Sequence, residues 1–154
     1  MKKLIVIFVS AVFFFSCNKE EVSALKSLNA LEGKWDISQV DLSKLSKEFK
    51  LTKINGTVDF IYCKVKLDLI KSPNYLCEGA ATFNNKSFFL TYKYDDATKI
   101  LKLFVSPQEI GTEEEQNIAF IMSGDWKIDN STNTFTAIRQ PNTKVSDISF
   151  TAKK

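Results

Sequence analysis

The sequence predicts an all-β fold: an antiparallel up-and-down β-barrel of eight or nine strands with a short N-terminal helix, preceded by a cleaved signal peptide. Three observations support this prediction. Apolar and polar residues alternate with a period of two through much of the chain after residue 56. Short clusters of turn-forming residues separate these stretches. No long helical pattern connects them, so successive strands should be antiparallel neighbours.

The first 16 residues have the three parts of an export signal. Lys2 and Lys3 provide positive charge, a mostly apolar run follows over residues 4–15, and Ser16 precedes Cys17. This run is shorter than the ~20 apolar residues that span a bilayer. It therefore predicts a signal peptide over residues 1–16. The alternative is a buried N-terminal helix with a free cysteine.

The end of this segment, Phe14-Phe15-Ser16-Cys17, resembles the lipobox of bacterial lipoproteins, in which a small residue precedes a cysteine that is acylated. Ser16 matches the pattern, whereas Phe14 stands where the family prefers leucine. The resemblance implies that Cys17 is lipidated and anchors the chain to a membrane. The following Lys19-Glu20-Glu21 is similar to an export signal of one Gram-negative phylum, which implies an outer-membrane, surface-exposed lipoprotein. An ordinary charged tether is the alternative.

Composition fits one small domain behind this anchor. The prediction assigns residues 17–27 to a lipid-anchored tether and residues 28–154 to the β-barrel domain. Hydrophobic residues make up 44% of the chain, enough for a core. The chain has 21 basic and 18 acidic side chains, and two of the lysines lie in the signal. The remainder is nearly neutral and shows no basic stripe, which argues against a nucleic-acid partner.

The predicted elements follow in order along the domain. A helix is expected over residues 23–31, with Ser23 as its N-cap, because leucines recur there at helical spacing. A strand begins at Gly33-Lys34-Trp35, and apolar residues between Leu42 and Phe49 predict a brief second helix or a loop. Period-two alternation predicts strands at 61–69, 88–94, 101–105, 118–122, 126–128 and 148–152. The turn signals between them are Ser72-Pro73-Asn74, Asn84-Asn85-Lys86, Asp95-Asp96-Ala97-Thr98, Asp129-Asn130-Ser131 and Pro141-Asn142.

Two further cysteines, Cys63 and Cys77, lie on the apolar phase of strand-like stretches. They face each other if the chain turns near Ile70. If it turns at residues 72–74, they are out of register and cannot reach without a bulge. An oxidising compartment favours a disulfide. Two cysteines without a histidine cannot complete an ordinary zinc site, so no metal is expected.

Gly33-Lys34-Trp35, preceded by a helical turn, resembles the G-x-W motif of lipocalins. Trp126-Lys127-Ile128 and the hairpin after it resemble the later W-x-I strand of small lipocalin-like domains found as lipoproteins in Gram-negative bacteria. The resemblance covers about residues 28–152 and implies a calycin-type barrel. The alternative is any antiparallel β domain with a core tryptophan.

In lipocalins the first tryptophan closes one end of the barrel beneath a basic side chain of the last strand. The resemblance implies such a partner for Trp35. Arg139, the only arginine, is one candidate. Another strand over residues 145–152 follows it, so Lys153 or Lys154 is the alternative.

The residues that usually support catalysis are absent or isolated. The chain has no histidine, which removes Ser-His-Asp and Cys-His systems. Glu113-Glu114-Glu115 is expected to be a solvated run in a loop, and Asp95-Asp96 a simple turn. Five glycines form no phosphate-binding loop. The prediction is therefore a non-enzyme without a cofactor.

The predicted function is binding of a small apolar ligand or a partner protein at the cell surface. Inward positions of the strands predict the ligand-binding residues Phe88, Leu90, Tyr92, Tyr94, Phe120, Met122 and Phe150. The alternative is a barrel filled by its own side chains, which acts only through its surface loops as an interaction module. A third class, an inhibitor of a hydrolase, needs a protruding loop, and residues 106–116 are the best candidate.

Overall fold

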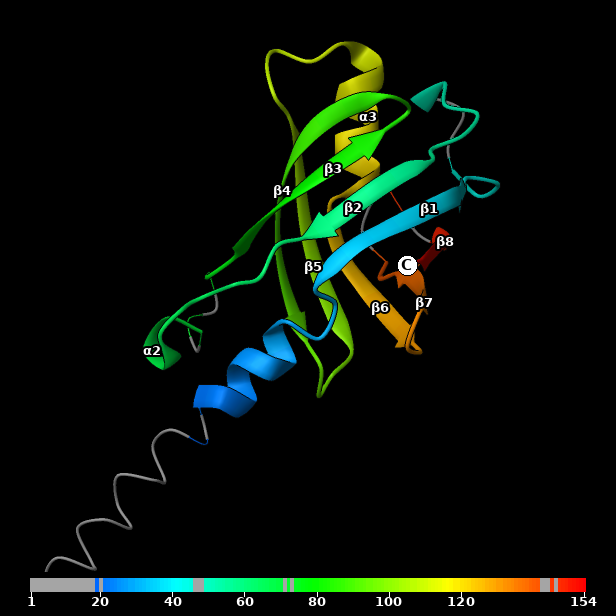
Figure 1. Ribbon diagram of the computed structural model, residues 1–154. Helices are drawn as coiled ribbons and strands as arrows, with labels where there is room; N and C mark the ends of the chain where they lie inside the picture. The colour runs from blue at the N-terminus through cyan, green and yellow to red at the C-terminus, as the bar shows by residue number, and fades with distance from the viewer. Residues whose placement is uncertain are drawn as a thin grey trace, which may run out of the picture.

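The computed structural model describes residues 19, 21–45, 49–70, 72, 74–141, 145 and 147–154 of the chain. They form a closed antiparallel barrel in which eight strands pair in sequence order (Figure 1). The strands are β1 (Gly33–Asp41), β2 (Gly56–Phe60), β3 (Cys77–Phe83), β4 (Lys86–Asp95), β5 (Ile100–Pro107), β6 (Gly124–Asn130), β7 (Thr134–Arg139) and β8 (Ser149–Lys153). The predicted all-β up-and-down barrel is confirmed. The predicted signal peptide and Cys17 lie outside the described residues.

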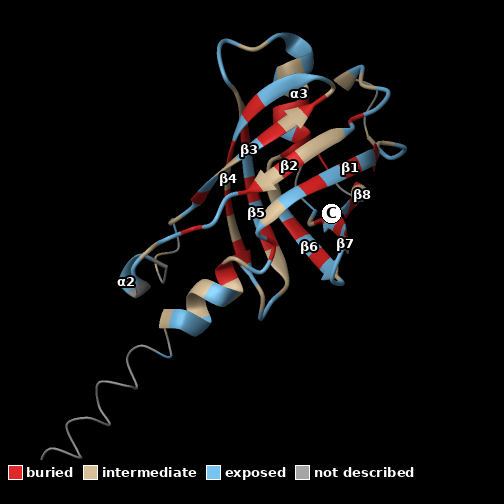
Figure 2. Ribbon diagram, in the orientation of Figure 1, coloured by how far each residue is buried: buried red, intermediate tan, exposed pale blue. Residues whose placement is uncertain are grey.

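Alternation of side chains along the strands builds the core. In β4 every second residue from Phe88 to Tyr94 is buried, and Figure 2 shows the same alternation around the barrel. Pairing of β1 with β8 closes the ring, with a register shift between Ile37 and Val40. Closure places the inward side chains of all eight strands in one interior.

Three helices lie at the two ends of the barrel. The N-terminal helix, residues 21–28, and α2 (Leu67–Ile70) lie at one end, which we call the lower end after its position in Figure 1. Helix α3 (Glu113–Met122) lies at the opposite, upper end. The prediction of Ser23 as the N-cap is wrong, because residues 21 and 22 already belong to the helix.

The predicted strand over residues 61–69 is wrong. β2 ends at Phe60, residues 61–66 have no regular structure, and α2 follows. The side chain of Asn29 takes the place of a strand partner: its Oδ1 accepts from the Cys63 backbone N–H at 2.7 Å, and its Nδ2 donates to the Cys63 carbonyl at 3.2 Å. The N-terminal helix thus satisfies backbone groups that a sheet would otherwise pair.

The predicted strand over residues 118–122 is also wrong, since this run is the second half of α3. A capping box starts the helix: the Thr112 hydroxyl accepts from the Glu115 N–H at 3.3 Å, and the Glu115 carboxylate accepts from the Thr112 N–H at 2.8 Å. Glu113-Glu114-Glu115 is therefore the first helical turn and not a loop. Carboxylates at this position stabilise the positive end of the helix dipole.

The predicted turn at Asn84-Asn85 is confirmed as a tight hairpin. Both residues have positive φ, 50° and 65°, as a type I′ turn requires. The Asn84 side chain also accepts from the Asn55 N–H at 3.2 Å and donates to the Lys53 carbonyl at 3.1 Å. It thereby ties the connection between β1 and β2 to the upper end. Leu42, at the start of this connection, lies in a loop, and Phe49, further along it, has a 3₁₀ conformation, so none of the described residues between β1 and β2 is α-helical.

Candidate functional site

The barrel interior contains six of the seven residues predicted to bind a ligand. They are at most 3% exposed: Phe88, Leu90, Tyr92, Tyr94, Met122 and Phe150. They pack against other core side chains, as in the edge-on pair of Phe60 and Tyr92 with ring centroids 4.9 Å apart. Burial of the Tyr92 hydroxyl raises its pKa to about 12. These residues therefore fill the barrel, and their proposed contact with a ligand stays a prediction.

Phe120 does not belong to this interior. It lies on the outer face of α3, is 43% exposed, and stacks on Phe49 at a centroid distance of 5.7 Å. Because the segment is a helix, Ile118, Ile121 and Met122 face the core and Phe120 faces away. The predicted inward position of Phe120 is wrong for this reason.

The lower end of the barrel is closed by the predicted G-x-W motif. Trp35 is 2% exposed, and its indole N–H donates to the Leu31 carbonyl at 2.7 Å. The Lys154 ammonium lies 4.7 Å from the Trp35 ring centroid and donates to the Glu32 carbonyl at 2.7 Å. Trp35 is therefore buried at the end of the barrel that carries the N-terminal helix. Its basic partner is Lys154 instead of Arg139.

Arg139 covers the other tryptophan, at the upper end. Its guanidinium carbon lies 5.3 Å from the Trp126 ring centroid, and the Trp126 indole N–H donates to the Met122 carbonyl at 3.0 Å. Gly124 has φ +128°, and a Cβ there would lie 2.2 Å from Arg139 Nη1. Only a glycine leaves room for the guanidinium at this position.

Sequence reasoning missed that these two closures are copies of one motif. Gly33-Lys34-Trp35-Asp36-Ile37 and Gly124-Asp125-Trp126-Lys127-Ile128 share the pattern G-x-W-x-I, and each follows a helix. Each tryptophan contacts a phenylalanine edge-on, Trp35 with Phe135 at 4.7 Å and Trp126 with Phe150 at 4.8 Å. The signal was the second G-x-W in the sequence. Since β1 and β6 run in opposite directions, the copies close opposite ends.

The predicted disulfide is confirmed at the lower end. Cys63 and Cys77 are bonded, with their Cα atoms 5.6 Å apart. The β2–β3 pairing explains this proximity. Phe60, at the end of β2, lies opposite Gly79, so Cys63, three residues after Phe60, lies next to the start of β3. The chain reverses around α2, close to the turn near Ile70 that the sequence offered as the in-register alternative, although the connection is irregular instead of a tight hairpin.

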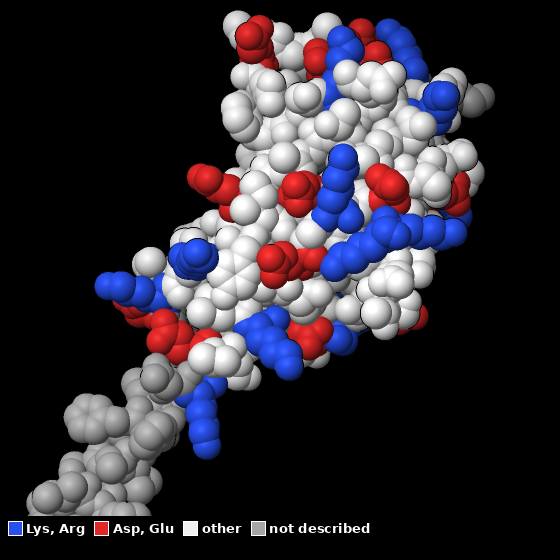
Figure 3. Space-filling model, viewed as in Figure 1, with Lys and Arg blue, Asp and Glu red and all other residues white. Residues whose placement is uncertain are grey.

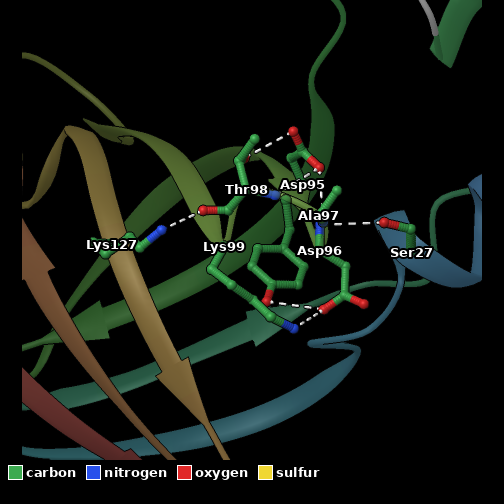
Figure 4. Close-up of polar contacts among 8 residues, drawn as sticks. Ser27, Asp95, Asp96, Ala97, Thr98, Lys99 and Lys127 are labelled. Carbon is green, nitrogen blue, oxygen red and sulfur yellow. Dashed lines mark hydrogen bonds and ion pairs between the residues drawn. The ribbon is translucent and has the colours of Figure 1, made fainter.

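The predicted turn at Asp95 is confirmed, and its carboxylate is fully engaged (Figure 4). Asp95 accepts from the Thr98 hydroxyl at 2.8 Å and from the Ala97 N–H at 3.0 Å. The Thr98 hydroxyl is the main reason that the pKa of Asp95 is lowered. The Asp95 side chain thus accepts hydrogen bonds from residues that follow it within the same turn, as in an Asx turn.

The neighbouring Asp96 fastens this turn to the N-terminal helix. Its carboxylate pairs with Lys99 at 2.6 Å, which lowers the pKa of Asp96, and accepts from the Tyr94 hydroxyl at 3.2 Å. Its N–H donates to the Ser27 hydroxyl at 3.2 Å (Figure 4). Both aspartates thus serve structural contacts, and the arrangement offers no free base at this turn.

A solvent-open groove lies on the outside of the upper end, with a volume of about 580 Å³. It runs between the β1–β2 connection, the Asn84-Asn85 turn and the first turns of α3. Most of its lining residues are polar, but apolar atoms contribute a similar share of the exposed lining: Phe49, Lys50, Leu51, Thr52, Lys53, Asn55, Asn84, Asn85, Glu113, Glu114 and Asn117. An ion pair at 3.3 Å joins Lys50 and Glu113 across it.

Beside this groove, the connection from β5 to α3 protrudes from the barrel (Figure 1). Ile110 at its tip is fully exposed. The Gln116 side chain donates to the Gly111 carbonyl at 2.9 Å, and the capping box of Thr112 fixes the next residue. The loop therefore presents an apolar side chain on a braced backbone.

The described residues contain no group of three or more His, Cys, Asp or Glu side chains placed to hold a metal ion. Within the same part of the chain, no helix is long and apolar enough to cross a membrane. No protein-family model, no curated protein and no solved structure matches this chain.

Proposed function

We propose that this chain is a lipid-anchored, non-enzymatic binding module in which the barrel is a filled scaffold and the upper end contacts a partner protein. The observation that supports this most is Ile110, a fully exposed apolar side chain on a braced, protruding loop. Exposed apolar groups lose unfavourable contact with water when a partner covers them. Preorganisation of the loop lowers the entropy lost on binding.

The closed interior favours this function over an apolar ligand inside the barrel. Trp35 and Trp126 close opposite ends, and the side chains between them are packed. Entry of a ligand would require one closure to open. The outer surface of the upper end is accessible without such a change.

The proposed anchor is consistent with this orientation. Lipidation of Cys17 would attach the chain next to the N-terminal helix, at the lower end, and leave the groove and Ile110 at the far end. A protein on the outer membrane surface would then present this end to the surroundings. The inhibitor class expected from the sequence is one form of this function, in which the partner is a hydrolase.

A photo-crosslinking amino acid at position 110, introduced in the native host, tests the proposal. We expect a discrete protein adduct from position 110 and none from position 138, an exposed isoleucine on the wall of β7 that serves as the matched control. Ile110→Asp should abolish copurification of the same partner, whereas Ile138→Asp should not. Native mass spectrometry that shows a stoichiometric small apolar molecule and no partner would contradict the proposal.

A further inference from the structure

Exposed apolar side chains gather at the lower end of the barrel. Ten large apolar side chains of the described residues are exposed, and five of them lie there, between 37% and 63% exposed. We call these five the basal patch: Val22, Ile61, Tyr62, Leu69 and Leu76. They come from the N-terminal helix and from the segment between β2 and β3 that contains α2. Such a concentration on one end of a small domain marks a contact surface.

The parts of the basal patch are held together as one surface. Val22 and Tyr62 line the same shallow hollow. The two hydrogen bonds between Asn29 and Cys63 join the helix to the segment after β2, and the disulfide fixes that segment to β3. These contacts connect the N-terminal helix, the segment after β2 and the start of β3.

The sequence before the helix supports a lipid surface as the occupant. Val22 follows Cys17 by five residues. Because an extended chain advances at most ~3.3–3.6 Å per residue, Val22 lies within about 18 Å of Cys17. A lipid chain on Cys17 would hold the patch beside the membrane at a high effective concentration. We propose that the basal patch rests on the lipid surface as a second, non-covalent membrane contact, an inference that depends on the lipid anchor proposed above.

The charges around the patch indicate that this contact is mainly apolar. The described residues of the two segments carry Lys26, Lys64 and Lys66 against Glu21, Glu32 and Asp68, with Lys19 preceding them, and Figure 3 shows both signs interspersed at this end. A balanced surface gains little from anionic lipids and depends weakly on salt. Tyr62 suits the membrane interface, because its ring is apolar and its hydroxyl is polar.

Quenching by brominated lipids tests the contact. Full-length protein purified from the membrane is reconstituted in phosphatidylcholine vesicles whose acyl chains are brominated or plain. Tyr62→Trp places a fluorophore in the patch, and Ile110→Trp places one at the upper end as the control. The buried Trp35 and Trp126 give the same background in both. We expect at least threefold stronger quenching for Tyr62→Trp, with little change between 0.1 and 1 M salt, a range chosen to remove surface electrostatics.

A second variant tests the apolar mechanism. Replacement of Ile61 and Leu69 by serine in the Tyr62→Trp protein should reduce the quenching severalfold while the circular dichroism spectrum is kept. Equal quenching at positions 62 and 110 would overturn the proposal. So would a position 62 that is shielded from both brominated lipid and aqueous iodide, since a second copy or another protein would then cover the patch.

The mass of the intact protein separates the two proposals. An acylated mature N-terminus without preferential quenching at position 62 would retain the anchor and reject the basal contact. A chain without acyl groups would reject the anchor. The basal contact would then be judged by the same quenching ratio for protein mixed with preformed vesicles.

Discussion

The two closures of the barrel use the same five-residue pattern but treat their cations differently. At the lower end, Lys154 lies over Trp35 and donates to the Glu32 carbonyl at 2.7 Å. At the upper end, Arg139 lies over Trp126, is only 4% exposed, and has no hydrogen-bond partner for Nε and Nη1 among the described residues. Burial lowers the pKa of Arg139, and the nearby Asp125 opposes this shift. The shared motif therefore determines how each tryptophan packs. Whether the cation over it finds hydrogen-bond acceptors depends on the residues around it.

The largest expected effect comes from removal of either tryptophan. Trp35→Ala and Trp126→Ala should each lower the free energy of unfolding by ~3–5 kcal/mol, because each deletes a fully buried ring. Phe135 and Phe150, which contact the two tryptophans, lie 5.8 Å apart. The double variant should therefore deviate from additivity in urea denaturation by at least ~0.5 kcal/mol. A loss below ~1 kcal/mol for either single variant would show that this tryptophan does not close its end of the barrel.

The disulfide should produce the next largest effect, confined to the lower end. Cys63→Ser together with Cys77→Ser should lower the free energy of unfolding by ~3 kcal/mol, since the bond closes a loop of about 15 residues. Hydrogen exchange should accelerate at the end of β2 and the start of β3, and stay unchanged in β6. Free thiols in the folded, exported wild type would contradict the expected effect.

Replacement of Arg139 and Lys154 by a neutral residue should change the free energy of unfolding in opposite directions. Arg139→Met should raise the free energy of unfolding by about 1–3 kcal/mol, because it removes a buried guanidinium whose Nε and Nη1 have no acceptor among the described residues, and it keeps a similar volume. Lys154→Met should lower it by about 1 kcal/mol, because it removes a hydrogen bond and a cation over a ring. Chemical denaturation of the two variants side by side measures both. Losses of equal size would show that the closures are energetically alike.

The smallest expected effect concerns the helix of the upper end. Thr112→Ala removes the hydroxyl of the capping box and should lower the free energy of unfolding by about 1 kcal/mol. Ser43→Ala, in an exposed turn outside the helix, is the control and should change it by less than ~0.5 kcal/mol. Faster hydrogen exchange in the first turn of α3 should accompany the loss. An unchanged exchange rate there would mean that packing of α3 alone holds its start.

Strands β1, β4, β5, β6 and β8 could be predicted because their alternation decides which face is buried, whereas no strand was predicted over β2, β3 or β7. The tight turn at Asn84-Asn85 was equally visible, since asparagine tolerates positive φ. Helix α3 was not predicted, because a run such as Ile118 to Met122 satisfies both a period of two and one face of a helix. The Thr112-x-x-Glu115 capping box would have decided in favour of the helix.

The partner of Trp35 could not be chosen from the sequence alone. Arg139 and Lys154 both end a strand, but successive antiparallel strands end at opposite ends of a barrel. The choice between Arg139 and Lys154 therefore depends on the exact number of strands. Arg139 is the last residue of β7, and Lys154 directly follows β8. The exposed Ile110 and the basal patch were also beyond the sequence, because exposure of an apolar side chain depends on which elements pack over it.

The pairing of β8 with β1 has a consequence for contacts between copies of the protein. Every strand has a hydrogen-bonded neighbour on both sides, so the ring presents no row of unpaired amides to another chain. An unpaired sheet edge would serve as a template for aggregation. Since β8 has only five residues, loss of its short pairing with β1 would expose two such edges, one on each strand.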